Sequence, residues 1–127
     1  MPASLALQQA PYVSLRTFRK SGVAVDTPVW CAPTANGDLF IFSAGQAGKV
    51  KRLRNSSAAA LAICDYRGRL HGEWIDAHAE LVTGAAQVTE ALDALHAKYG
   101  WQMRLADWGA RLTGKYNQRA YIRVRVP

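Results

Sequence analysis

Residues 45–55 read Gly45-Gln46-Ala47-Gly48-Lys49-Val50-Lys51-Arg52-Leu53-Arg54-Asn55, with two glycines ahead of four positive charges. Glycines allow a tight turn, and a helix that begins at such a turn directs free amides and the positive end of its dipole toward an anion. At 100° per residue Lys49 and Arg52 project together, whereas Lys51 and Arg54 project together on another side. The pattern predicts a phosphate-binding corner in which Lys49 and Arg52 share one phosphate. The alternative is an ordinary solvated basic face of a helix.

The segment ahead of this corner indicates a sheet. Leu39 to Ser43 is an apolar strand, and the Asn36-Gly37 pair before it favours a hairpin, because both residues accept positive φ. The preceding strand, from Val23 to Ala32, contains Pro28, which cannot donate to a ladder and therefore indicates a sheet edge or a bulge. Such breaks often accompany ligand sites.

The remaining periodicities predict further strands and a pair of long helices. Alternation indicates strands, and apolar residues at helical spacing indicate helices. The expected strands are Tyr12 to Phe18, Ala58 to Tyr66, Leu70 to Val82 and Arg119 to Val126; the expected helices are a short one or an irregular lead-in at Pro2 to Ala10, a short one at the basic corner, one from Gln87 to Tyr99 and one from Trp101 to Leu112. In the last helix, Trp101, Leu105, Trp108 and Leu112 share one face, and we expect this stripe in the core. The whole chain, residues 1–127, is expected to be a single domain, mainly β (α+β), built as a six-stranded antiparallel barrel with flanking helices.

The composition limits the possible partners and compartments. A net charge of +7 and an isoelectric point near 9.9 favour an anionic partner such as nucleic acid, a phosphorylated cofactor or an acidic membrane surface. No apolar run approaches the roughly 20 residues of a membrane helix, and Met1 to Ala10 lacks the features of a signal peptide, so we expect a cytoplasmic protein without a membrane span. Cys31 and Cys64 lie in apolar runs without CxxC spacing, which favours buried reduced thiols over a disulfide.

Side chains for metal or acid–base chemistry do not form a recognisable set. His71 and His78 are seven residues apart on one predicted strand and should face opposite sides, and His96 is alone on a helix. No GxSxG motif occurs, and the carboxylates within residues 65–80 occupy strand positions where solvent-facing acids are ordinary. We therefore expect neither a metal site nor a catalytic residue.

A small basic barrel with exposed aromatic side chains also describes a protein that binds single-stranded nucleic acid. In this chain Trp101 and Trp108 align at helical spacing, while Trp30, Phe40 and Phe42 lie among apolar neighbours. Most of the aromatic residues are therefore expected in the core or in the wall of a pocket. Nucleic-acid binding is retained as the less favoured alternative.

Several short segments carry a family resemblance when they are taken in order. They are Thr17-Phe18-Arg19, Thr27-Pro28-Val29-Trp30, Leu39-Phe40-Ile41-Phe42-Ser43, the run from Gly48 to Asn55, Cys64-Asp65-Tyr66-Arg67-Gly68, Gly72-Glu73-Trp74 and Lys98-Tyr99-Gly100. The order and spacing of the segments within about residues 12 to 84 resemble the split-barrel flavoprotein superfamily named after pyridoxamine 5'-phosphate oxidase, and Lys98-Tyr99-Gly100 at the end of the first long helix is similar too. The nearest branch is similar to the small flavin/deazaflavin oxidoreductases.

The resemblance implies a split barrel that forms a homodimer and holds FMN or the deazaflavin coenzyme F-420 in sites at the dimer interface. Lys49 matches the family's phosphate lysine, and Ser43 matches a hydroxyl at the end of the preceding strand. The strand from Thr27 to Trp30 matches the one beside the ring system, although a place in the core is an equal alternative for Trp30. The expected cofactor-binding residues are Thr27, Pro28, Val29, Trp30, Phe42, Ser43, Gly48, Lys49, Lys51 and Arg52.

The chain also departs from the pyridoxamine 5'-phosphate oxidases. The arginine and histidine positions that hold pyridoxal phosphate have no evident counterpart, the closing C-terminal motif is missing, and Ala47-Gly48 stands where the oxidases often place Ser-Arg. We therefore expect an oxidoreductase other than pyridoxamine 5'-phosphate oxidase, which transfers hydride or electrons between its bound cofactor and a small organic substrate. The run from Gly48 to Arg54 is closer to the deazaflavin branch. The alternative is a flavin- or haem-binding protein of the same fold without turnover.

Overall fold

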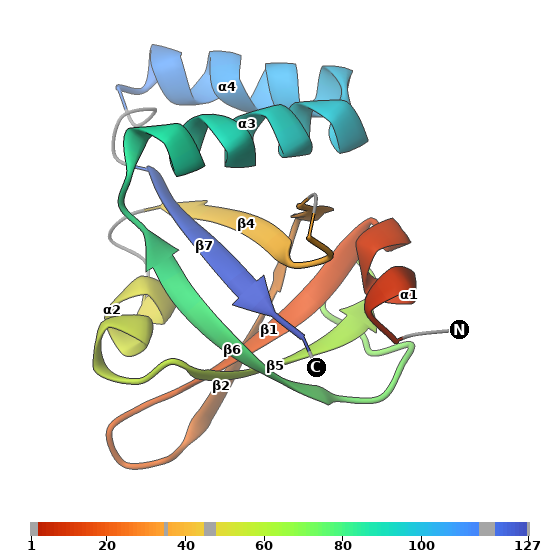
Figure 1. Cartoon of the computed structure of the whole chain (residues 1–127), viewed down its shortest axis with the longest axis vertical. Helices are drawn as coiled ribbons and strands as arrows, with labels where there is room; N and C mark the ends of the chain where they lie inside the picture. Colours follow the sequence, from red (N-terminus) through yellow and green to blue (C-terminus); the bar gives the residue numbers. More distant parts are fainter. Residues whose placement is uncertain (1–2, 35, 45–47, 115–118, 127) are drawn as a thin grey trace.

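The computed structural model describes residues 3–34, 36–44, 48–114 and 119–126, and Figure 1 shows a curled sheet with a pair of helices on one side of it. In chain order the elements are α1 (Ala3–Gln9), β1 (Tyr12–Phe18), β2 (Ala24–Val29), β3 (Cys31–Pro33), β4 (Leu39–Ala44), α2 (Gly48–Asn55), β5 (Ala58–Cys64), β6 (Ile75–Val82), α3 (Ala85–Tyr99), α4 (Trp101–Leu112) and β7 (Arg119–Arg125). Within the described residues, no helix combines the length and apolar character that crossing a membrane requires.

The sheet has seven strands in the order β2-β1-β5-β6-β7-β4-β3, and every neighbouring pair is antiparallel. Its two edge strands, β2 and β3, are consecutive in the sequence and are separated only by Trp30. The chain itself therefore joins the two edges of a sheet that is not closed by hydrogen bonds. This arrangement is a split barrel with flanking helices, as the sequence predicted.

The expected number of six strands was wrong because the predicted strand from Val23 to Ala32 is two strands. The chain leaves β2 at Trp30 and pairs on the opposite edge of the sheet through β3. Pro28 lies in the edge strand β2, opposite Ser14 of β1. The edge position predicted for this proline, which has no N–H to donate, is therefore confirmed.

The hairpin predicted from Asn36-Gly37 is present and delivers β4 to the start of α2. Thr34 Oγ1 accepts hydrogen bonds from the backbone N–H groups of Asn36 and Asp38, both at 3.1 Å, and Gly37 has a φ of 87°. The register pairs Pro33 with Leu39 and continues along β3 and β4. Because β4 also pairs with β7, the hairpin fixes the strand that carries Phe42 and Ser43.

The predicted long strand from Leu70 to Val82 is shorter than expected. The strand β6 begins at Ile75, and Leu70 makes only an isolated bridge with Cys64. The carboxylate of Asp65 explains the difference, because it accepts the backbone N–H groups of Arg67 and Arg69 at 2.9 and 3.0 Å and stabilises a turn in place of a ladder.

The core has two parts that meet across the sheet. One lies inside the barrel and includes Leu15, Ile41 and Leu61, each fully buried. The other lies under α3, where Leu95 packs near Phe40. Both cysteines, Cys31 and Cys64, are free and buried, as predicted.

The stripe on α4 was expected in the core but faces solvent. Trp101 is 69% exposed, Leu105 56%, Trp108 64% and Leu112 68%, whereas Met103 and Asp107 on the other face of the helix are buried. The sequence period correctly identified an apolar face. It did not reveal that α4 lies outside α3 and packs through its opposite side (Figure 1).

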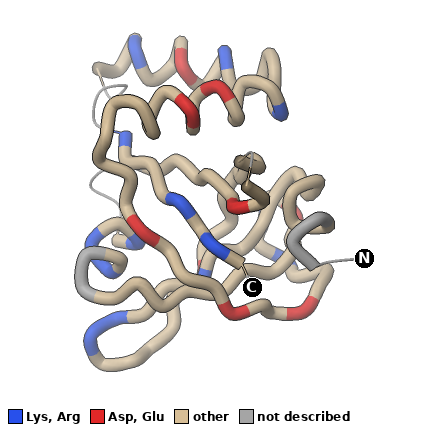
Figure 2. The backbone as a smooth tube through the Cα atoms, in the orientation of Figure 1, with Lys and Arg blue, Asp and Glu red and all other residues tan. Residues whose placement is uncertain are grey.

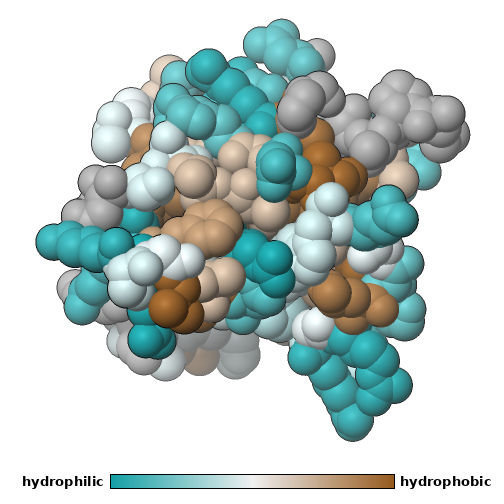
Figure 3. Space-filling model, turned by 90° about the horizontal axis from the view of Figure 1, so that it is seen from below, coloured by the Kyte–Doolittle hydropathy of each residue, from teal (hydrophilic) through white to brown (hydrophobic). Residues whose placement is uncertain are grey.

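Charge and apolar surface are unevenly distributed over the molecule. Lys and Arg residues gather at α2 and at the neighbouring turn between β1 and β2, as Figure 2 shows. On the side opposite the helical pair, apolar patches alternate with hydrophilic side chains (Figure 3). Further Lys and Arg residues lie along β7 and on α4 in the view of Figure 2.

Candidate functional site

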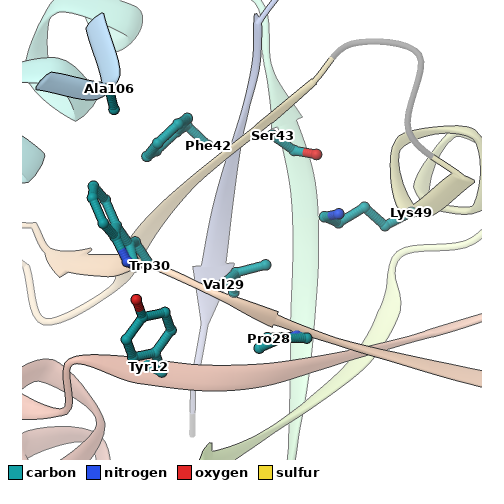
Figure 4. Close-up of a pocket in the computed structure, with 8 residues that line it drawn as sticks. All are labelled: Tyr12, Pro28, Val29, Trp30, Phe42, Ser43, Lys49 and Ala106. Carbon is teal, nitrogen blue, oxygen red and sulfur yellow. The ribbon is translucent and has the colours of Figure 1, made fainter. Parts of the chain in front are cut away.

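A cleft of about 410 Å³ opens where the chain passes from β2 to β3. It lies between that junction, the end of β4, the start of α2 and the inner side of α4 (Figure 4). The residues that line it are Tyr12, Pro28, Val29, Trp30, Phe42, Ser43, Lys49 and Ala106. Lys49 and Ser43 extend toward the same part of the cleft, and Trp30, Phe42 and Tyr12 form the other part.

The C-terminal end of α3 holds the junction between β2 and β3 in place. Tyr99 Oη donates to the carbonyl oxygen of Pro11 at 2.8 Å and accepts the backbone N–H of Cys31 at 3.0 Å. Lys98 Nζ donates to the carbonyl oxygens of Ala10 and Cys31 at 2.7 and 2.6 Å. These hydrogen bonds satisfy backbone groups at the junction between β2 and β3, where the chain leaves one edge of the sheet for the other. The Lys98-Tyr99 pair therefore sets the position of Trp30.

The aromatic part of the cleft is backed by further ring contacts. Trp30 stacks on Tyr99 with ring centroids 4.5 Å apart and an interplanar angle of 12°, and it meets Phe42 edge-on at 6.0 Å. The guanidinium of Arg119 lies 4.7 Å from the centroid of the Phe42 ring. Offset and edge contacts of this kind fix ring orientation as well as burying area. The wall that a ligand meets is thus preformed.

An ion-pair network anchors α4 beside this wall. Asp107 accepts Arg119 Nη1 at 2.6 Å through one carboxylate oxygen and contacts His96 Nε2 at 2.7 Å through the other. The side chains of Arg119 and Asp107 are only 7% and 12% exposed. Because Asp107 follows Ala106 in the chain, the ion pair between Asp107 and Arg119 also holds Ala106 at the edge of the cleft.

The other part of the cleft is cationic, as the sequence predicted for the start of α2. Burial lowers the pKa of Lys49 below its ordinary value, and the charge of Arg52 lowers it further. Burial, and then the charge of Arg19, lowers the pKa of Arg52. Among the described residues, no carboxylate pairs with Lys49, Arg52 or Arg19. Three like charges are thus held near each other without compensation, which an anion would relieve.

The first turn of α2 adds to this positive potential. It contains no acidic residue, although a helix N-terminus normally favours one. The Arg52 side chain folds back over this turn, where a Cβ on Gly48 would lie 2.7 Å from Arg52 Nη1, and Nε donates to Thr17 Oγ1 at 2.6 Å. Gly48 therefore leaves room for a guanidinium at the helix start. The part of the predicted corner at residues 45–47 lies outside the described residues.

A polar atom without a partner lies in the strand beside the cleft. The hydroxyl of Thr27 is buried, and it has no hydrogen-bond partner within the described chain. Thr27 and Val29 lie two residues apart on β2 and hence on the same face of the strand, and Val29 lines the cleft. A buried hydroxyl left unpaired costs about 1–3 kcal/mol.

The structure brings six of the ten predicted residues into the described lining of the cleft: Pro28, Val29, Trp30, Phe42, Ser43 and Lys49. Arg52 and Gly48 shape the start of α2 beside it, and Thr27 lies behind Val29. Lys51 is exposed on α2, outside that lining.

Tyr12 and Ala106 were missed. The position of Tyr12 at the start of a strand carried no functional signal. Ala106 has no chemistry of its own, and only its place on the face opposite the Trp101 stripe indicated that it packs inward.

The cleft suits a ligand with a planar body and an anionic end. It offers aromatic and aliphatic walls, the hydroxyl groups of Ser43 and Tyr12, and the positive charge of Lys49. Its described lining residues include no histidine and no carboxylate; the titratable side chains among them are Tyr12 and Lys49. The donor set therefore fits a phosphorylated ring cofactor that brings its own chemistry.

Comparison with known proteins gives a likeness of fold. No family model matches the chain, and no curated protein matches it by sequence. Among solved structures, it is similar to the haem storage protein HutZ from Vibrio cholerae, with a TM-score of 0.68 and 11% identity over 94% of this chain and 84% of that one. It is also similar to an FAD-binding protein from Mesorhizobium loti, with a TM-score of 0.66 and 14% identity over 97% and 84% of the two chains.

A third similar structure is the Agrobacterium tumefaciens protein Atu2129, whose function is unknown. It has a TM-score of 0.71 and 17% identity, and the match covers 94% of this chain. The chain spans only 50% of the length of that protein. At these identities the comparisons establish that the split-barrel fold is shared. One of these neighbours is a haem storage protein, and another binds FAD.

Proposed function

We propose that this chain is an oxidoreductase that binds FMN or the deazaflavin coenzyme F-420 in the cleft between α2 and Trp30. The observation that carries the proposal is the positive charge of Lys49 and Arg52 on α2, with Arg19 in the neighbouring turn, beside an aromatic wall; among the described residues no carboxylate pairs with these three side chains. A flavin or deazaflavin bound there supplies hydride or electron transfer, and the protein orients it. The flavin-binding neighbour of the same fold supports this choice of ligand class.

Each part of the cleft has a separate role in this proposal. Lys49 and the amides of the first turn of α2 hold the phosphate, and Ser43 donates or accepts one further hydrogen bond. The backbone of Pro28 and Val29 would contact the ring system of the bound cofactor. Trp30, Phe42 and Ala106 would exclude water from the bound ring, and a small organic substrate would reach it from the open side of the cleft.

We further propose that the protein acts as a homodimer with the cofactor at the interface. The cleft is open to solvent on one side, and a second copy would cover a ring that one chain holds only in part. The family resemblance supports this arrangement.

The second candidate is a haem-binding protein without turnover. It is favoured by the haem storage protein among the structural neighbours and by Tyr12 in the cleft wall, since a phenol of this kind would be able to bind haem iron. In this reading the same aromatic wall holds the porphyrin, and the basic end of the cleft meets its propionates.

Titration of the purified full-length chain with FMN, coenzyme F-420 and hemin, each followed by absorbance, separates these functions. Saturable binding of FMN or F-420 at one per chain, followed by turnover with a reduced nicotinamide or reduced F-420 as donor, supports the oxidoreductase. A Soret shift with hemin and no flavin binding favours the haem protein. A folded chain that ignores all three ligands but binds single-stranded oligonucleotides would overturn both.

A further inference from the structure

The outer face of α4 carries an apolar stripe that consists of Trp101, Leu105, Trp108 and Leu112, and each of these side chains is more than half exposed. Single exposed apolar side chains are normal, whereas a contiguous apolar patch marks an interaction site on a protein or a membrane. The α4 helix lies on the outside of α3, away from the sheet (Figure 1). A flat surface can therefore contact the stripe along the whole helix.

The charges that flank the stripe on α4 have one sign. The structure describes this helix throughout, and its exposed charged residues are Arg104 and Arg111. At 100° per residue both arginines project along the same flank of the stripe, about 10 Å apart. The one carboxylate of the helix, Asp107, is buried and is bound by Arg119 and His96. The exposed half of α4 thus combines large apolar side chains with positive charge and carries no negative charge.

The exposed carboxylates of the neighbouring helix do not change this balance. Glu90 and Asp93 are exposed, but they belong to α3. That helix contacts the buried face of α4, where His96 meets Asp107 at 2.7 Å. Glu90 and Asp93 therefore lie behind α4 and not on the surface that the stripe forms.

We propose that α4 docks this protein on the surface of an anionic lipid bilayer, with the helix axis in the plane of the membrane. The apolar stripe enters the boundary between headgroups and acyl chains, and Arg104 and Arg111 contact the headgroup phosphates. Helices with large apolar side chains on one face and basic residues beside them bind membrane surfaces in this way. Tryptophan suits this depth, because its ring is apolar while its indole N–H can donate to a headgroup.

The geometry of α4 fits a position in the plane of the membrane. Its 12 residues extend over about 18 Å, well short of the roughly 30 Å of the hydrocarbon core. Trp101 and Trp108 are seven residues apart and project within about 20° of each other. Both rings therefore reach the same depth when the helix lies flat. The long arginine side chains on the flank can extend from that depth to the phosphates.

The single sign of the flanking charge favours an anionic bilayer over a second copy of the chain. Two copies packed through the stripe would bring the arginines of both copies to one contact, and the exposed half of α4 has no carboxylate to pair them. An anionic bilayer supplies the opposite charge along its whole surface. It also accepts an outermost helix without a groove of matching shape.

Vesicle co-sedimentation of the full chain without added cofactor tests this docking. Vesicles of phosphatidylcholine and phosphatidylglycerol in equal parts should bind the wild-type chain and shift its tryptophan emission to the blue. Phosphatidylcholine vesicles should bind at least about 20-fold more weakly, since each basic residue near an anionic surface contributes about fivefold. Trp101→Ser/Trp108→Ser should weaken binding at least about 100-fold and remove the blue shift, while the circular dichroism spectrum stays unchanged.

Two further variants assign the contact to α4. Arg104→Gln/Arg111→Gln should lower the affinity for the anionic vesicles about 25-fold, to the level of the neutral ones. The matched control is Lys20→Gln/Val23→Ser, which removes one exposed basic and one exposed apolar side chain from the turn between β1 and β2 and should bind as the wild type does. An equal loss in this control would place the contact at the basic region near α2 and overturn the proposal.

The remaining outcomes also decide the question. A wild-type chain that stays in the supernatant with anionic vesicles, or a tryptophan variant that binds them as tightly as the wild type, overturns the proposal. So does a chain that ignores vesicles but loses self-association, or binding to a single-stranded oligonucleotide, when the two tryptophans are replaced. Because cofactor is absent from these assays, such a failure leaves the proposed cofactor site untouched.

Discussion

Replacing Lys49 by methionine should separate the stability of the ligand-free protein from its ability to bind a ligand. The Lys49 ammonium is partly buried beside Arg52, and both effects lower its pKa, so the charged form is disfavoured in the folded state. Methionine keeps much of the apolar stem and removes the charge. We therefore expect Lys49→Met to unfold at a higher urea concentration than the wild type at neutral pH.

The pH dependence of that difference follows from the sign of the shift. Because the folded state binds the Lys49 proton less tightly than the unfolded state, the unfolded chain carries more protons between the lowered pKa and the ordinary value of 10.5. The free energy of unfolding of the wild type therefore gains a contribution as pH rises through this range. The advantage of Lys49→Met should accordingly shrink as pH approaches 10.5.

Ligand binding should change in the opposite direction. A charge-assisted hydrogen bond to phosphate is worth about 1.5–3 kcal/mol, which corresponds to roughly a 10- to 150-fold loss in affinity for FMN or F-420. The assay is flavin or deazaflavin fluorescence titration of the wild type and the variant.

Lys51→Ala is the matched control, because Lys51 carries the same charge on the same helix but is exposed. Equal losses for Lys49→Met and Lys51→Ala, or a variant that is less stable and binds as tightly as the wild type, would refute the reasoning.

Three further substitutions test the support of the cleft by urea unfolding. Thr27→Val removes a buried hydroxyl that lacks a partner in the described chain and should stabilise the ligand-free fold by about 1 kcal/mol; destabilisation would mean that the hydroxyl is satisfied. Tyr99→Phe leaves the N–H of Cys31 without its acceptor and should cost about 1–3 kcal/mol, so an unchanged midpoint would argue against the clamp. Asp107→Asn removes the charge that balances buried Arg119 and should cost about 3 kcal/mol, with Glu90→Gln as the exposed control.

The sequence predicted those parts of the fold that depend on local patterns. The Asn36-Gly37 turn, the strand that follows it and the helix beginning at Gly48 are all present. Lys49 and Arg52 also lie close enough for the charge of Arg52 to lower the pKa of Lys49, while their sharing of one phosphate stays a prediction. These features depend on backbone preferences and helical spacing within a few residues.

The errors arose where distant contacts decide the outcome. The break at Trp30 is held by Lys98 and Tyr99, nearly 70 residues later in the chain, and no local pattern signals it. The exposed stripe beginning at Trp101 shows a similar limit, because a helical period identifies an apolar face but not the surface that covers it. Ala106 was missed because alanine has no functional group. Only its position in the folded chain shows that it lines the cleft.

The most direct test of the central claim compares FMN with riboflavin, which has the same ring and ribityl chain but no phosphate. If the start of α2 holds the phosphate, the wild-type chain should bind FMN at least about tenfold more tightly than riboflavin in a fluorescence-quenching titration at low salt, as expected for one charge-assisted contact. The same comparison can be made between F-420 and its deazaflavin core without the phosphate. Equal affinity with and without the phosphate, in a chain that binds the ring, would contradict the account.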